Sequence, residues 1–277
     1  MRTQNWHPVS TSDARPRNCL AACAISDADG YTGIAEGMDP THLVEFVNSY
    51  FKTLFAAVLG NGGVVADVKG DGVLALWTSE APDVELRTRV CRGCLRMVEA
   101  AEHFNRAFPG QRLPTRVGAD FGPIALANVG AFARFEYRAV GDTVNTCSRL
   151  EQLNKQLGTR VLVSEALAQG VDAFLFRDLG DFTLRGKRTS LRVFELLGER
   201  SWVAQEQVLL CEHFARARSD YEAGRIDDAI AGFGALCARH PQDGPSRFFL
   251  RRCTERAEMR NTGFGRDCDS ALSFAVH

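Results

Sequence analysis

Apolar positions along the first part of the chain change their spacing several times, which indicates a mixture of helices and strands. A helix is predicted over residues 40–60, with an Asp cap before it, Pro in its first turn and a run of Gly at its end. Two strand-like runs follow at 64–69 and 73–77. The Gly-Asp-Gly sequence at 70–72 predicts a tight turn, so these runs should form a hairpin.

The remaining segments of this region also alternate between short apolar runs and long amphipathic stretches. Further helices are predicted at 82–108 and 140–157, and further strands at 19–26, 114–120, 160–163, 174–185 and 191–197. Helices interleave with hairpins here and not with single parallel strands. The pattern therefore predicts an α+β fold of the ferredoxin-like kind, an antiparallel-rich sheet covered by helices.

The pattern becomes purely helical near Arg200. It predicts a small all-α extension, a helix pair of the tetratricopeptide type followed by a third helix. One such repeat cannot bury a solenoid core alone, so we expect it to pack on the preceding domain or on a protein partner. The predicted segments are a polar lead-in at 1–18, a mixed domain at 19–199, the helical extension at 206–259 and a flexible tail at 260–277.

Composition narrows the classes of function. The 277 residues carry a net charge of −1, which gives no basic surface for nucleic acid or for an anionic membrane. A nucleotide polyphosphate would have to be held by a few placed cations and metals. No stretch approaches the roughly 18 apolar residues that a membrane span needs, and no signal peptide is evident. We expect a cytoplasmic chain, or the cytoplasmic part of a longer membrane-anchored protein.

The nine cysteines are irregularly spaced and often lie within apolar runs, which is typical of reduced cytosolic thiols. Cys91 and Cys94 form the only CxxC pair. Because no second pair or nearby His pair accompanies it, we interpret these cysteines as two positions on one face of a buried helix, in preference to a zinc or redox site.

Two carboxylates occupy places that suit metal ligands. Asp27 directly follows the first predicted strand, and Asp71 lies at the tip of the predicted hairpin between two glycines, which let a ligand approach the backbone closely. Taken singly, each Asp is also an ordinary turn residue, since Asp-Gly is a common turn sequence. The residues alone leave both interpretations open.

The surrounding sequence resembles the catalytic domain of class III adenylyl and guanylyl cyclases over about residues 19–197. Five segments carry the resemblance in the order of that family: residues 26–36 and 68–77, which resemble its two metal motifs, residues 113–130, residues 137–149, which resemble its transition-state helix, and the phosphate-binding turn at 185–187. The likeness is greatest to bacterial adenylate cyclases that carry a sensor ahead of the catalytic domain.

The resemblance implies a set of metal ligands. Asp27 and Asp71 resemble the pair that holds two Mg²⁺ or Mn²⁺ ions in each active site, and the carbonyl of Ala28 is implied as an extra ligand. Such ions would activate the ribose 3′-hydroxyl and hold the triphosphate.

The resemblance also implies the residues that act on the substrate. Arg149 resembles the group that stabilises the transition state, and Asn145, four residues earlier on the same helix face, resembles the one that orients the ribose. Arg116 and Lys187 resemble the cations that bind the leaving phosphates. Taken alone, each of these three cations is also interpretable as a solvated surface charge.

Two positions depart from the family pattern where the base is selected. Asp67 stands where many adenylyl cyclases have Lys, and Arg138 stands where many have Asp. One acceptor and one donor remain, but hydrogen-bond chemistry allows this pair to read adenine, guanine or cytosine, or to bond to each other. The base therefore stays open from these residues.

The resemblance implies a homodimeric enzyme that converts ATP to 3′,5′-cyclic AMP and pyrophosphate in signalling, with active sites at the dimer interface. One chain supplies every part, so pairing with a second copy in two-fold symmetry is sufficient. A guanylyl or other nucleotidyl cyclase is the first alternative. A catalytically silent nucleotide-binding dimerisation module is the second.

Overall fold

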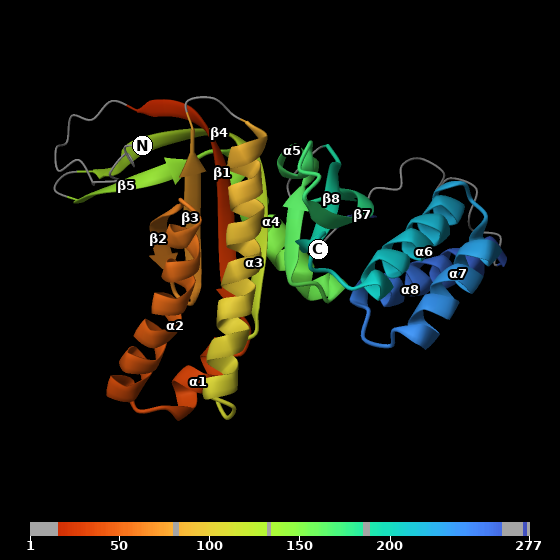
Figure 1. The fold of residues 1–277 in the computed structure, drawn as a ribbon, viewed down its shortest axis with the longest axis horizontal. Coiled ribbons are helices and arrows are strands. Elements are labelled where there is room, and N and C mark those ends of the chain that lie inside the picture. Colours follow the sequence, from red (N-terminus) through yellow and green to blue (C-terminus); the bar gives the residue numbers. More distant parts are fainter. Residues whose placement is uncertain (1–15, 80–82, 132–133, 185–188, 262–273, 276–277) are drawn as a thin grey trace.

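The computed structural model describes residues 16–79, 83–131, 134–184, 189–261 and 274–275. Within them a mixed sheet of nine strands runs in the order β2-β3-β1-β4-β6-β8-β7-β9, and β5 pairs with the far part of β4 (Figure 1). Pairing is antiparallel except at β4–β6 and β7–β9. The strands are β1 Arg17–Ala28, β2 Val64–Lys69, β3 Gly72–Thr78, β4 Thr115–Ala131, β5 Arg134–Val140, β6 Val161–Ser164, β7 Phe174–Thr183, β8 Leu191–Glu199 and β9 Phe274–Ala275.

Alternating side chains of the strands divide the core into two sides. Ala22 and Ala24 of β1 lie in the cluster under α2 (Pro40–Gly60) and α3 (Val84–Ala107). Ala21 and Cys23 face the other way, toward α4 (Asp142–Leu157). This period of two is what a sheet covered on both faces requires. The predicted α+β class, with helices over an antiparallel-rich sheet, is confirmed.

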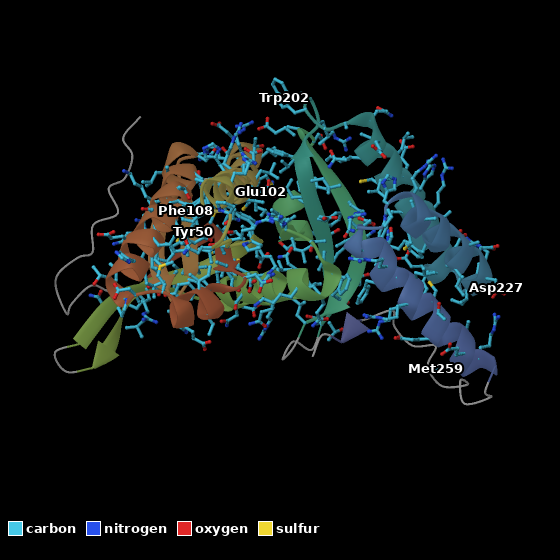
Figure 2. The ribbon with its side chains drawn as sticks, turned by 90° about the horizontal axis from the view of Figure 1, so that it is seen from below. Tyr50, Glu102, Phe108, Trp202, Asp227 and Met259 are labelled. Carbon is cyan, nitrogen blue, oxygen red and sulfur yellow. The ribbon has the colours of Figure 1, made fainter. Side chains whose placement is uncertain are left out.

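Helix α2 begins as its sequence predicts. The Asp39 carboxylate accepts hydrogen bonds from the backbone N–H groups of Thr41 and His42, and Pro40 occupies the first turn. Among the described residues only α2 is long and apolar enough to cross a membrane by length and composition. It packs beside α3, and its buried side chains, Tyr50 among them, belong to the apolar cluster between these helices and the sheet (Figure 2).

Three helices follow the mixed domain: α6 (Gln205–Glu222), α7 (Ile226–Arg239) and α8 (Gly244–Asn261). The predicted helical extension is therefore present, while its likeness to a tetratricopeptide repeat stays a prediction. The helices gather at the β7–β8 end of the sheet (Figure 1). Trp202, on the connection that leads to them, projects outward and is 85% exposed (Figure 2).

The extension shares an apolar cluster with the mixed domain. Leucines of α4 and aromatic residues of α6–α8 form one buried group that includes Leu150, Leu153, Leu157, Phe214, Phe233 and Phe249. The backbones also meet, since a Cβ added at Gly244 would lie 2.0 Å from the carbonyl oxygen of Leu157. A buried ion cluster joins the same parts, because Arg177 of β7 binds both Glu195 of β8 and Asp243 before α8.

Several elements differ from the expected ones. The strand predicted at 114–120 continues as β4 to Ala131 and turns back as β5, so Arg138 lies on a strand and α4 begins only at Asp142. Two short helices, α1 (Tyr31–Gly37) and α5 (Glu165–Ala168), were not predicted. Within the predicted tail, α8 continues to Asn261 and β9 pairs with β7.

Candidate active site

Three neighbouring strands bring the predicted metal carboxylates to one end of the sheet. Asp27 lies at the end of β1, directly across from Arg116 of β4 in the antiparallel register. Asp71 lies in the β2–β3 turn, whose Gly70 has a φ of 62°. A Cβ added at Gly72 would lie 2.8 Å from the carbonyl oxygen of Ser26, so only glycine lets the hairpin lie this close to β1.

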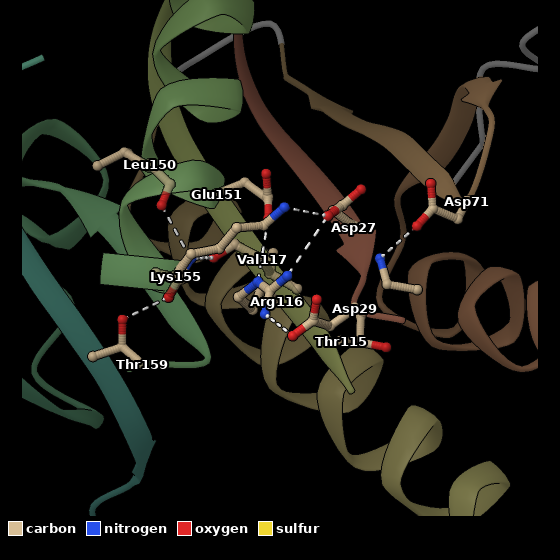
Figure 3. A network of polar contacts seen from close by, with 12 residues as sticks. Asp27, Asp29, Asp71, Thr115, Arg116, Val117, Leu150, Glu151, Lys155 and Thr159 are labelled. Atoms are coloured by element: carbon tan, nitrogen blue, oxygen red, sulfur yellow. Dashed lines mark hydrogen bonds and ion pairs between the residues drawn. The ribbon is translucent and has the colours of Figure 1, made fainter. Parts of the chain in front are cut away.

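The backbone of β1 also holds Asp71 in place. The N–H of Ala28 donates to Asp71 Oδ2 at 3.3 Å (Figure 3). Burial raises the pKa of Asp71, and the nearby charge of Asp27 raises it further. A divalent cation would relieve both effects, because carboxylate oxygens are the ligands that Mg²⁺ and Mn²⁺ favour. The residues present therefore fit such an ion. Within the described part of the chain, no third acidic, His or Cys side chain completes a ligand cluster.

Arg116 is the buried cation of the site. Its residue is 8% exposed, and its Nη1 donates to Asp29 Oδ2 at 3.0 Å. Nη2 lies 3.8 Å from Asp27 Oδ2, and Nε lies 3.5 Å from Glu151 Oε1. Both Nε and Nη2 are buried without a hydrogen-bond partner. Burial works against the charge of Arg116, but the carboxylates outweigh it and raise the pKa of the guanidinium.

Helix α4 adds two charged side chains to this group. Lys155 Nζ lies 3.2 Å from Asp27 Oδ2, so the ammonium and the Arg116 guanidinium approach the same carboxylate oxygen (Figure 3). Burial raises the pKa of Glu151 to about 7, and the charge of Asp27 adds to that rise. The helix is held against β4 here, because Asn154 Nδ2 donates to the carbonyl of Val117.

The predicted transition-state residues do not join this group within one chain. Asn145 and Arg149 both lie on α4, where Asn145 is exposed and Arg149 is half-buried. At about 100° per residue, the side chains of Arg149 and Glu151 leave the helix roughly 160° apart. Because Glu151 points to Arg116, Arg149 points away from its own chain's Asp27.

The predicted base-reading residues lie on different strands. Asp67 is on β2 at an irregularity in its pairing with β3, and its Oδ1 accepts from the N–H of Val68. Arg138 is exposed on β5, opposite Ala127 of β4. Lys187, the predicted phosphate-binding cation, lies outside the described residues.

Sequence reasoning missed three members of the charged group: Asp29, Glu151 and Lys155. Asp29 lies within residues 26–36, the first metal motif, but was given no role of its own. Glu151 and Lys155 stand four residues apart, the spacing of one helix face, and that spacing was a usable signal. What the spacing does not reveal is which strand this face covers.

The CxxC pair lies inside α3, as interpreted. Cys91 and Cys94 are both buried, and burial raises the pKa of Cys94 to about 12. A thiol held protonated in this way behaves as a small apolar side chain.

Comparison with known proteins places this geometry in a family. Residues 18–198 match the sequence profile of the adenylate and guanylate cyclase catalytic domain. The chain belongs to that family. The cyclase domain is 37% identical over 178 residues to adenylate cyclase 1 of Rhizobium meliloti, an alignment that covers 63% of this chain and 27% of that protein. The chain thus spans well under half of that relative.

Solved structures agree on the fold of the cyclase domain. The adenylyl cyclase CyaB of P. aeruginosa superposes with a TM-score of 0.61 at 20% identity, covering 69% of this chain and all of that one (100%). The guanylyl cyclase Cya2 superposes with a TM-score of 0.58 at 23% identity, covering 67% and 95%. At these identities the comparison concerns architecture, and both adenylyl and guanylyl cyclases share it.

Proposed function

We propose that this chain is an adenylate cyclase that converts ATP to 3′,5′-cyclic AMP and pyrophosphate as a homodimer. The observation that supports it most directly is the pair of carboxylates, Asp27 and Asp71, set by strand register beside the buried Arg116. Family membership and the 37% identity to a bacterial adenylate cyclase support the same activity. The chain would meet its nucleotide in the cytoplasm.

The chemistry divides among the named residues. Two Mg²⁺ or Mn²⁺ ions on Asp27 and Asp71, with the carbonyl of Ala28, would make the ribose 3′-hydroxyl more acidic and neutralise the triphosphate. Asn145 orients the ribose so that its oxygen faces the α-phosphorus in line with the leaving pyrophosphate. Arg149 donates to the phosphoryl oxygens as negative charge builds there.

The leaving group has its own contacts in this proposal. Arg116 and Lys187 bind the pyrophosphate. Arg116 suits the task because two of its buried N–H groups have no hydrogen-bond partner, and an anion would satisfy them.

The direction of α4 supports the dimer in this proposal. Arg149 points away from its own Asp27, so a complete site needs Arg149 and Asn145 from a second copy. Two-fold symmetry then gives two equivalent sites. Asp27→Ala and Asn145→Ala should each be inactive alone, and a mixture should recover part of the activity, since one site in each mixed dimer keeps all its parts. No recovery despite demonstrated subunit exchange would contradict shared sites.

The preference for ATP over other nucleotides is the most specific part of the proposal, and it rests on the similarity to bacterial adenylate cyclases. The decisive measurement is kcat/KM of the purified protein with Mn²⁺ and each of the four nucleoside triphosphates. A preference for ATP supports the adenylate cyclase assignment, and a preference for GTP replaces it with guanylate cyclase. Absence of turnover with all four favours a silent nucleotide-binding module.

The same assay tests the two base-reading positions. If Asp67 and Arg138 read the base, Asp67→Ala and Arg138→Ala should lose discrimination between ATP and GTP more than they lose rate, because a site built for a polar partner rejects other groups strongly. An unchanged ATP/GTP ratio in both variants removes them from base recognition.

A further inference from the structure

The C-terminal half of α4 contacts the metal carboxylate of its own chain. Lys155 Nζ lies 3.2 Å from Asp27 Oδ2. One turn earlier, Glu151 lies 3.5 Å from Arg116 Nε, and Arg116 itself approaches the same Asp27 oxygen at 3.8 Å. Asp27 is thus held from two sides by cations, one on a strand and one on a helix (Figure 3).

The N-terminal half of α4 carries Asn145 and Arg149, the residues proposed to act on the substrate in the partner's site. Asn145 and Lys155 stand ten residues apart, about 15 Å along the helix axis. That separation allows the two halves of the helix to contact two different sites.

We propose that Lys155, supported by the Glu151–Arg116 pair, is a positioning residue for Asp27 of its own chain, so that each α4 serves both active sites of the dimer. Its first half supplies Asn145 and Arg149 to the partner's site, and its second half fixes the metal carboxylate of its own site. The inference rests on the proposed homodimeric function for the first half only. The contacts of Lys155 lie within one chain.

Lys155 has two effects on Asp27. Its ammonium fixes the orientation of the carboxylate, which favours a productive metal geometry. It also places a positive charge next to the place that a metal ion would occupy, which weakens binding of that ion. Its side chain is 50% exposed, so solvent screens the second effect and keeps it moderate.

Binding of Mn²⁺ without nucleotide separates this role from a merely structural one. Lys155→Met should tighten Mn²⁺ binding, measured by the free-ion signal in electron paramagnetic resonance, by roughly three- to tenfold, because a nearby positive charge is removed. It should lower kcat by about tenfold, because Asp27 loses its fixed orientation. Lys155→Arg should restore both toward wild type. Lys52→Met is the matched control, since Lys52 is an exposed lysine of α2 and is not among the cations that contact Asp27.

Unchanged or weaker Mn²⁺ binding in Lys155→Met, with the melting temperature preserved, would overturn the role of Lys155. The same change in Lys52→Met would overturn it too, because the effect would then be one of overall charge. The titration needs neither turnover nor a dimer, so failure of the proposed cyclase activity leaves its result interpretable.

Mixed dimers test whether Lys155 acts within its own chain. In a mixture of Asp27→Ala and Asn145→Ala chains, the one intact site uses Asp27 of the Asn145→Ala chain. Lys155→Met added to that chain should lower the recovered activity about tenfold, and added to the Asp27→Ala chain it should leave the recovered activity unchanged. Equal losses in both arrangements would overturn action within one chain. No recovery in the parent mixture would overturn the proposal that each α4 contributes to both active sites. The Mn²⁺ titration would still test whether Lys155 acts on Asp27 of its own chain.

Discussion

Replacing Gly118 by Ala should displace α4, the helix that carries the proposed catalytic residues Asn145 and Arg149. Gly118 lies on β4 under α4, and a Cβ there would lie 2.2 Å from both the carbonyl oxygen of Cys147 and the N–H nitrogen of Glu151. Ordinary contacts begin near 3.4 Å, so the strand and helix would have to separate by about 1.2 Å. Neither neighbour is the tip of a flexible side chain, and backbone cannot move aside alone.

The expected losses follow from that separation. Overpacking of this kind costs about 1–3 kcal/mol of stability. A misplacement of about 1 Å in groups that position a substrate lowers the rate by roughly 100-fold. Gly118→Ala should therefore remain folded and lose far more activity than its stability loss explains. Denaturant unfolding gives the first quantity, and kcat/KM with ATP and Mn²⁺ gives the second.

Gly234→Ala provides the matched control. Gly234 lies within α7, and a Cβ there meets no atom within 4 Å. The same substitution should stabilise the protein by about 0.5–1 kcal/mol through helix propensity and leave activity unchanged. If Gly118→Ala matched Gly234→Ala in both measurements, β4 and α4 would not be in the close contact described, and α4 would not depend on Gly118 for its position.

Three other predictions concern single residues. Arg149→Ala should lower kcat by about 100-fold or more with little change in KM; a pure KM effect would mean that Arg149 only binds substrate. The buried Glu151 has a pKa of about 7, above its ordinary value of 4.5, so it keeps its proton to higher pH in the folded chain than in the unfolded one. Its contribution to stability is therefore complete below about pH 4.5 and is lost as the pH rises through 7. Glu151→Gln should therefore lose less stability than wild type between about pH 5 and pH 8 in denaturant titrations, and an equal loss would contradict the assignment. Arg177→Met should cost about 3–5 kcal/mol of unfolding free energy, because it leaves the buried Glu195 and Asp243 without their cation; a loss below about 1 kcal/mol would show that the pair is solvated.

The sequence predicted best those helices and strands that begin or end at a capping residue or a tight-turn sequence. The Asp39 cap located the start of α2, and Gly-Asp-Gly located the hairpin that carries Asp71. Strand β5 was missed because residues 137–140 were assigned to the same motif as the helix that follows them. Arg138 was consequently expected near a helix and lies on a strand.

Only part of the candidate site could be predicted from the sequence. Asp27, Asp71 and Arg116 lie in recognisable sequence motifs, and the strand register brings them together. Glu151 and Lys155 become part of the site only because α4 lies closely over β4, and that closeness depends on a glycine in another element. Such a contact is a property of the packed structure, and the helical spacing of the two residues alone does not specify it.

The apolar cluster that joins α4 to α6–α8 has a mechanical consequence. The C-terminal part of α4 packs against the appended helices, so a tilt of α4 would disturb its packing with Phe214 and Phe249. A shift of the appended helices would therefore be transmitted to α4, because the two share this cluster and the backbone of Gly244 lies close to that of Leu157. In the dimer proposed above, the packing of this joint would limit how far Asn145 and Arg149 can move relative to the partner's site.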